Sequence, residues 1–125
     1  MATPEVELLV GARRDGVVPS LAIGFGGIWT EALDDVAVVP LPVSPERAER
    51  AILSLRAAPL LTGARGRQPL DLADAAELAS RAGDTLLEHD LALLELNPVA
   101  VGLDGCVALD AVAQRAGEPA HAEAA

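Results

Sequence analysis

The chain contains no lysine, and its nine basic residues are all arginine, against nineteen acidic residues. The formal net charge is −10. A surface of this charge repels phosphate backbones and anionic headgroups, which argues against nucleic acids and anionic membranes as partners. The absence of lysine also bears on phosphate chemistry, because most phosphoryl-transfer sites use one. A phosphoryl-transfer site built from this chain therefore needs cationic groups from elsewhere.

Aromatic residues and cysteines are almost as scarce. Phe25 and Trp29 are the only aromatic residues, so the core must consist of Leu, Val, Ile and Ala. Cys106 is the only cysteine, which excludes an internal disulfide and a cysteine-based metal cluster. Residues 1–6 lack an apolar targeting core, and the longest uncharged run, 16–30, is broken by proline and glycine. The sequence predicts a cytoplasmic protein that does not span a membrane.

The first third of the chain favours β-structure. Residues 5–13 alternate apolar and other side chains, as a half-buried strand does, and a second strand is expected over 17–23. The glycine-rich run 24–27 interrupts it, and we interpret this run as a tight backbone passage. A further strand pair is expected at 28–33 and 36–41.

Two helices are expected next. Ser44 and Pro45 form an N-cap and a first-turn proline, and Pro59 is expected to end the first helix. Asp71 is expected to cap the second helix, whose apolar stripe is Leu72, Ala75, Ala79, Ala82 and Leu86. Residues 62–69, between the helices, are predicted to form a non-periodic loop, and His89 a solvated or capping residue at the end of the second helix.

A β-hairpin is the most informative segment. Residues 91–100 and 106–112 flank Asp104-Gly105, a strong two-residue turn signal. This turn predicts that Val99 faces Asp110 and that Asn97 faces Val112. The opposite face is expected to pack into the core with four apolar residues: Leu94, Leu96, Val107 and Leu109.

On this hairpin Glu95, Asn97 and Asp110 share one face, with Asn97 and Asp110 as diagonal neighbours. Magnesium prefers hard oxygen ligands and commonly takes only one or two from the protein, so one carboxylate and one amide suit it. The alternative is that Asn97-Pro98 forms a turn and that Asp110 caps the end of a strand. Spacing alone leaves both interpretations open.

Taken together, the elements predict an α+β fold, a mainly antiparallel sheet with two helices packed on one side. The ordered domain is expected to cover residues 1–112, and 113–125 are expected to form a disordered tail rich in Ala, Glu and Gly. Cys106 is expected to be a small core residue near the hairpin turn.

Several sequence motifs in one order point to a known family. The run 88–98 followed by 107–110 resembles the ATP-grasp β subunit of succinyl-CoA synthetase. Over residues 5–112 the chain is more similar still to the ATP-grasp part of ADP-forming acetyl-CoA synthetases, with further landmarks at 7–15, 24–27 and 63–71. The resemblance implies the fold of the second ATP-grasp subdomain.

The resemblance also implies roles for individual residues. Asn97 and Asp110 would hold the Mg²⁺ that bridges the phosphates of ATP or ADP. Arg65 would contact a transferred phosphoryl group, although a solvated loop charge is the alternative. Glu7 would face the nucleotide ribose or be merely solvated, and Glu95 would support the metal site or line the cleft.

An ATP-grasp site encloses its nucleotide between two subdomains, and this chain resembles only the second. The first hypothesis is therefore an acid–thiol ligase, active only when a complementary ATP-grasp or CoA-binding subunit completes it. The second is a non-catalytic remnant that senses nucleotide or docks on a partner, and the third is a purely structural domain. A missing lobe leaves apolar surface exposed, so we expect a homo-oligomer or a hetero-complex.

Overall fold

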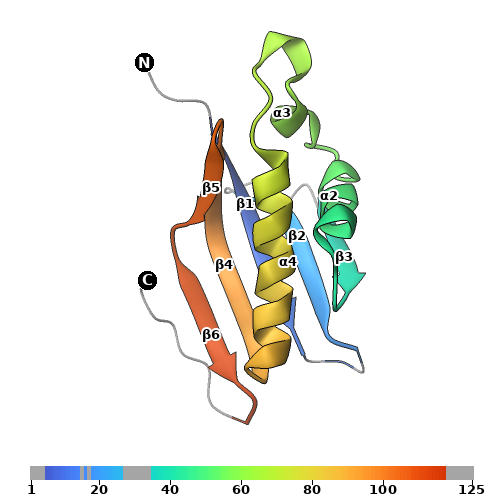
Figure 1. The fold of residues 1–125 in the computed structure, drawn as a ribbon, viewed down its shortest axis with the longest axis vertical. Coiled ribbons are helices and arrows are strands. Elements are labelled where there is room, and N and C mark those ends of the chain that lie inside the picture. Colours follow the sequence, from blue (N-terminus) through green and yellow to red (C-terminus); the bar gives the residue numbers. More distant parts are fainter. Residues whose placement is uncertain (1–4, 15, 17, 27–34, 118–125) are drawn as a thin grey trace.

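The computed structural model describes residues 5–14, 16, 18–26 and 35–117. Within them the chain forms one antiparallel sheet in the order β3-β2-β1-β4-β5, with β6 also paired to β4. Figure 1 shows α2 and α4 lying side by side on one face of this sheet. The predicted α+β fold is confirmed. The elements are β1 Val6–Arg13, β2 Ser20–Phe25, β3 Val36–Pro40, α2 Pro45–Leu53, α3 Pro59–Thr62, the 3₁₀ turn η1 Ala64–Gly66, α4 Leu72–Glu88, β4 Leu91–Gly102, β5 Gly105–Ala108 and β6 Ala111–Arg115.

The first strands follow the predicted alternation. In β1, Leu8, Val10 and Ala12 are buried against the helices, and the residues between them face the other way. β2 starts later than expected and continues through Gly24 to Phe25, instead of ending before the glycine run. It continues because both residues pair with β1. The expected strand 28–33 lies outside the described residues, whereas its expected partner is present as β3.

The first helix begins as predicted and ends earlier than predicted. The Ser44 hydroxyl accepts a hydrogen bond from the Arg47 N–H at 3.2 Å, which caps α2. The helix ends at Leu53, and Pro59 opens α3 instead of ending α2. Proline is tolerated in the first turn of a helix, where its missing N–H has no helical partner, so the same residue suits either role.

The cap of α2 is expected to be worth about 1 kcal/mol. Replacing Ser44 with Ala removes the acceptor for the Arg47 N–H, so Ser44→Ala should lower the free energy of unfolding in urea by about that amount. Ser44→Gly is the matched variant and should cost only a few tenths of a kcal/mol, because glycine is itself a good N-cap residue. Equal losses in the two variants would contradict this role of Ser44.

The second helix is confirmed in detail. The Asp71 carboxylate accepts a hydrogen bond from the Asp74 N–H at 3.0 Å and caps α4. Of the predicted stripe, Leu72 is half-buried and the others are buried: Ala75, Ala79, Ala82 and Leu86. His89 is the exposed C-cap residue of α4, as expected. The predicted loop 62–69 is more regular than expected, because the end of α3 and the turn η1 occupy half of it.

The hairpin forms, but its register is shifted by two residues from the predicted one. Gly102 pairs with Gly105, so the two turn residues are Leu103 and Asp104. In consequence Val99 faces Ala108 instead of Asp110. The returning strand is also divided into β5 and β6, with a break at 109–110. A shift of two residues preserves which face a side chain occupies, because strand side chains alternate with a period of two.

A bulge in β4 explains why Val107 and Leu109, which were expected in the core, are exposed. Between β1 and β4 the register changes by one residue around 97–98, within β4. An extra residue in one strand turns the following side chains to the other face. Val99 and Val101 are therefore buried, and Val107 is 55% exposed instead of packed. Leu109, also expected in the core, is 54% exposed, while Cys106 and Ala108 pack on the core in their place.

The C-terminal boundary also differs from the prediction. Residues 113–115, expected to belong to a disordered tail, are the second half of β6, which pairs with the first half of β4. The Ala116 N–H then donates to the Asp90 carbonyl at 3.4 Å. The remainder of the expected tail, 118–125, lies outside the described residues.

Candidate functional site

The face of the sheet opposite α2 and α4 carries a hollow of about 420 Å³, and we call this face the open face. Strand alternation explains it, because every second residue of β1, β2 and β3 must point away from the helices. The hollow is lined by small and apolar residues of these strands and by polar residues of β1, β2 and β4. The lining residues are Leu9, Val10, Gly11, Arg13, Ser20, Ala22, Gly24, Val36, Val38, Glu95 and Asn97. Val36 and Val38 are 48% and 65% exposed.

Asn97 and Asp110 lie directly opposite each other, closer than the diagonal placement that the sequence predicted. The Asn97 N–H donates to the Asp110 carbonyl oxygen at 3.2 Å, and the Leu109 N–H donates to the Pro98 carbonyl oxygen at 2.9 Å. The pair thus sits at the bulge of β4 and at the break between β5 and β6. Both side chains are exposed, and the Asn97–Pro98 peptide bond is cis.

The alternative roles proposed for this pair are partly realised. Asn97-Pro98 lies within β4 and does not form a turn. Asp110 does act locally, because its Oδ1 accepts the Ala111 N–H at 2.8 Å at the start of β6. This bond orients the carboxylate and leaves Oδ2 for another partner.

The two predicted glutamates share the open face in different ways. Glu95 lines the hollow beside Asn97. Glu7 is exposed and alternates with the buried residues of β1, which places it on the same face further along the strand. Its carbonyl oxygen accepts the Gly26 N–H at 2.8 Å, so the backbone after β2 runs close to it.

The glycines of this region permit close approach of the backbone. A Cβ on Gly24 would lie 3.2 Å from the Asp35 carbonyl oxygen, and one on Gly26 would lie 3.2 Å from the Glu7 Cβ. Both contacts are tighter than ordinary van der Waals contact, so a side chain at either position requires a shift of its neighbours. This agrees with the interpretation of 24–27 as a tight passage, of which Gly27 lies outside the described residues.

Two arginines bear on the candidate site, Arg65 from the sequence prediction and Arg13 from the structure. The Arg65 backbone lies in η1, and the placement of its side chain lies outside the described part of the chain. Arg13, which belongs to none of the predicted site residues, lines the hollow with Glu95 and Asn97. The signal that predicts it is the alternation of β1, in which Arg13 shares a face with Glu7.

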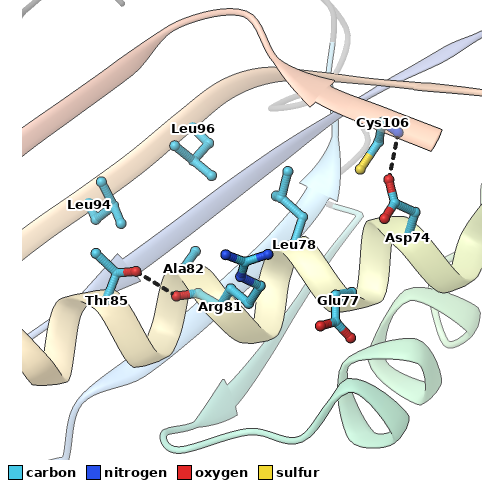
Figure 2. A pocket seen from close by; sticks show the side chains of 9 residues that line it. All are labelled: Asp74, Glu77, Leu78, Arg81, Ala82, Thr85, Leu94, Leu96 and Cys106. Atoms are coloured by element: carbon cyan, nitrogen blue, oxygen red, sulfur yellow. Dashed lines mark hydrogen bonds between the residues drawn. The ribbon is translucent and has the colours of Figure 1, made fainter.

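A second hollow, of about 400 Å³, lies on the helix side of the sheet between α4, β4 and β5. Figure 2 shows Leu94 and Leu96 pointing toward α4 at one end of it, and Asp74 facing Cys106 at the other. Of the predicted site residues whose side chains the structure describes, none lines this hollow. The candidate site is therefore the open face, where Glu95 and Asn97 lie.

The Cys106 thiol, which lines the helix-side hollow, is expected to be a poor nucleophile. Burial raises the pKa of its thiol from 9.0 to about 12, with a further contribution from the adjacent Asp74 carboxylate. The Asp74 Oδ2 also accepts the backbone N–H of Cys106 at 2.9 Å, which holds the carboxylate beside this residue. Because the thiolate is the reactive form, this environment argues against Cys106 as a nucleophile.

Alkylation kinetics test this pKa. At pH 8 the rise from 9.0 to about 12 lowers the thiolate fraction about 1,000-fold. We expect iodoacetamide to label folded Cys106 at least about 100-fold more slowly than the urea-unfolded chain. The raised pKa stabilises the fold below pH 9, and this contribution is lost as the pH rises from 9 toward 12. Asp74→Asn should speed labelling of the folded chain, and equal rates in folded and unfolded chain would contradict the assignment.

The donor set at Asn97 and Asp110 fits a magnesium ion that also binds phosphate. Among the described residues, no group of three or more His, Cys, Asp or Glu could hold a metal ion. A metal enclosed entirely by such ligands is therefore not formed by the described part of the chain. One carboxylate and one amide leave most of the octahedral positions of Mg²⁺ to water and phosphate oxygens, which is the usual arrangement at nucleotide sites.

None of the helices in the described part of the chain is both long and apolar enough to cross a bilayer.

The sequence pattern of the ATP-grasp domain matches residues 1–114. The chain is 34% identical over 107 residues to the beta subunit of ADP-forming acetate–CoA ligase I from Pyrococcus furiosus, which covers 84% of this chain and 46% of the relative. It is 33% identical over 97 residues to the ADP-forming 4-hydroxybutyrate–CoA ligase of Nitrosopumilus maritimus, covering 76% of this chain and 14% of that protein.

A solved structure agrees with the sequence relatives. The "dinucleotide forming" acetyl-coenzyme A synthetase 1 of Ca. Korarchaeum cryptofilum, in complex with coenzyme A and Mg-AMPPCP, superposes with a TM-score of 0.83 at 35% identity. The match covers 92% of this chain and 55% of that one. The chain thus spans about half the length of the solved chain and of the Pyrococcus beta subunit.

Proposed function

Because this chain belongs to the ATP-grasp domain family and is homologous to ADP-forming acyl-CoA synthetases, we propose that it is the Mg-nucleotide-binding half of an acid–CoA ligase. Asn97 and Asp110 hold Mg²⁺, which neutralises phosphate charge when bound. Glu95 supports the pair, Glu7 faces the nucleotide ribose, and Arg65 contacts the phosphoryl group. The nucleotide, ATP or ADP, occupies the hollow of the open face.

The direct opposition of Asn97 and Asp110 beside this hollow carries the proposal. Their backbones are joined at 3.2 Å, so the two side chains leave adjacent positions of one hairpin. Asn97 lines the hollow, and the exposed Asp110 is its hydrogen-bonded neighbour on the hairpin. This arrangement supplies two oxygen ligands next to a cavity of suitable size for part of a nucleotide.

The need for a complementary half follows from charge. Phosphoryl transfer depends on positioning and on neutralising the charge of the transferred group. This chain has nineteen acidic residues and no lysine, so it supplies too little positive charge by itself. Val36 and Val38, which line the hollow and are 48% and 65% exposed, are apolar surface that such a half covers. The relative from Pyrococcus furiosus is named as a beta subunit, which supports a hetero-complex over a homo-oligomer.

The complete assembly converts acyl-CoA, ADP and phosphate to a carboxylate, CoA and ATP, or runs the reverse reaction. The relatives named as acetate–CoA and 4-hydroxybutyrate–CoA ligases support this reaction class. The cytoplasmic location expected from the sequence stays a prediction.

Reconstitution tests the proposed function. The purified chain alone should form no ATP from acetyl-CoA, ADP, phosphate and Mg²⁺. Adding the first ATP-grasp half and the CoA-binding subunit of a homologous ligase should produce ATP formation that needs all components. The surface variant Asp104→Ala should form ATP at the same rate as the wild type in this mixture. ATP formation by the chain alone would contradict the need for a partner. Complex formation with no gain in activity would instead favour a non-catalytic remnant.

A further inference from the structure

A pocket of about 260 Å³ lies away from the open face, where the turn after α2 meets η1. Arg56 and Arg67 both line it, together with Ala57, Pro59 and Leu60. Two arginines therefore line one hollow in a chain whose net charge is −10. No acidic residue is among the described residues that line this pocket.

Backbone contacts hold the two segments that form the pocket, the turn after α2 with Arg56 and the segment around η1 with Arg67. The Asp35 carboxylate, only 8% exposed, accepts the Arg56 N–H at 2.8 Å and fixes the first segment. In the second segment Gly63 has a left-handed φ of +93°, and a Cβ there would lie 2.7 Å from the Arg67 carbonyl oxygen. The chain therefore folds back tightly after α3, and the close packing of Gly63 against the Arg67 backbone fixes the position of Arg67.

The chemistry of this pocket selects an anion. Both lining arginines are positively charged, so they attract an anion, and guanidinium groups donate hydrogen bonds to its oxygens. The planar guanidinium matches the oxygens of phosphate particularly well. Pro59 and Leu60 add an apolar wall, and Leu60 is 39% exposed. The volume is below that of sites for drug-sized ligands, which suits a small molecule.

We propose that Arg56 and Arg67 form an anion site for a small phosphate monoester, whose phosphate lies between the guanidinium groups and whose attached group packs on Pro59 and Leu60. The site uses none of the residues assigned to magnesium or nucleotide on the open face. It therefore stands or fails independently of the proposed ligase function.

Amide chemical shifts of the ¹⁵N-labelled full chain test the site. Phenyl phosphate is titrated at constant ionic strength, with inorganic phosphate as the probe that lacks an apolar group. We expect saturable shifts of the Ala57, Leu60 and Arg67 amides, with phenyl phosphate binding at least about threefold more tightly. Arg56→Gln and Arg67→Gln should each weaken binding about tenfold, because each removes a charge-assisted hydrogen bond.

Arg47→Gln is the matched control, since Arg47 is an exposed arginine of α2 outside the pocket, and it should leave binding unchanged. The unperturbed remainder of each spectrum shows that the variants are folded. Shifts that do not saturate, or an equal loss in Arg47→Gln, would overturn the proposal. Saturable binding of a polyglutamate peptide with no response to either phosphate would also overturn it and assign the pocket to an acidic protein partner.

Discussion

Replacing Leu86 with alanine is expected to lower the free energy of unfolding by about 2–5 kcal/mol. Leu86 is 0% exposed and lies in the core cluster that α4 forms with the sheet. The loss combines the transfer free energy of the removed atoms with the cavity that they leave. Urea denaturation followed by circular dichroism measures the loss. It is a large part of the total free energy of unfolding, which is about 5–15 kcal/mol for a native domain.

Leu53→Ala is the matched control for this prediction. Leu53 ends α2 and is 44% exposed, so the same chemical change should alter stability by no more than about 0.5 kcal/mol. Similar losses in the two variants would show that α4 does not pack on the sheet as described.

Removing the Asp35 carboxylate is expected to cost about 2–4 kcal/mol in the free energy of unfolding. This side chain is 8% exposed and accepts two backbone hydrogen bonds, from the Arg56 N–H at 2.8 Å and the Ala57 N–H at 3.0 Å. Asp35→Ala leaves both N–H groups without their acceptor, so the junction between β3 and the turn after α2 loses its main polar contact. Urea denaturation again measures the loss.

Two further variants separate this effect from a general loss of charge. Asp35→Asn keeps one acceptor oxygen and should cost about half as much as Asp35→Ala. Asp84→Ala removes an exposed carboxylate of α4 and should change stability by no more than about 0.5 kcal/mol. An equal cost for Asp84→Ala and Asp35→Ala would contradict the assigned role of the buried carboxylate.

The sequence predicts the elements of this fold better than their boundaries. The prediction of helix α4 is correct because its cap at Asp71 and its apolar stripe are both local sequence signals. The prediction that Pro59 ends the first helix is wrong, because proline is equally suited to follow one helix or to begin another. The division of the returning strand into β5 and β6 depends on pairing with a bulged β4, which no local pattern records.

The candidate site shows the same limit. Strand parity predicts that Asn97 and Asp110 belong together, and an error of two residues in register leaves their shared face intact while placing them directly opposite. The same parity fails for Val107 and Leu109, because the bulge turns the side chains beyond it to the other face. Arg56 and Arg67 come together only through the folding of the α3–η1 segment, so sequence spacing gives no indication of their pocket.

The central claim, a Mg-nucleotide half-site at Asn97 and Asp110, is tested most directly by calorimetric titration of the purified chain with ADP, with and without Mg²⁺. Asp110→Ala removes the proposed carboxylate ligand. Asp104→Ala removes an exposed carboxylate from the turn of the same hairpin and serves as the control. The account predicts Mg²⁺-dependent binding in the wild type and in Asp104→Ala, and its loss in Asp110→Ala. Binding that is independent of Mg²⁺, or equally strong in Asp110→Ala, would contradict the claim, as would the absence of heat at millimolar ADP in every protein.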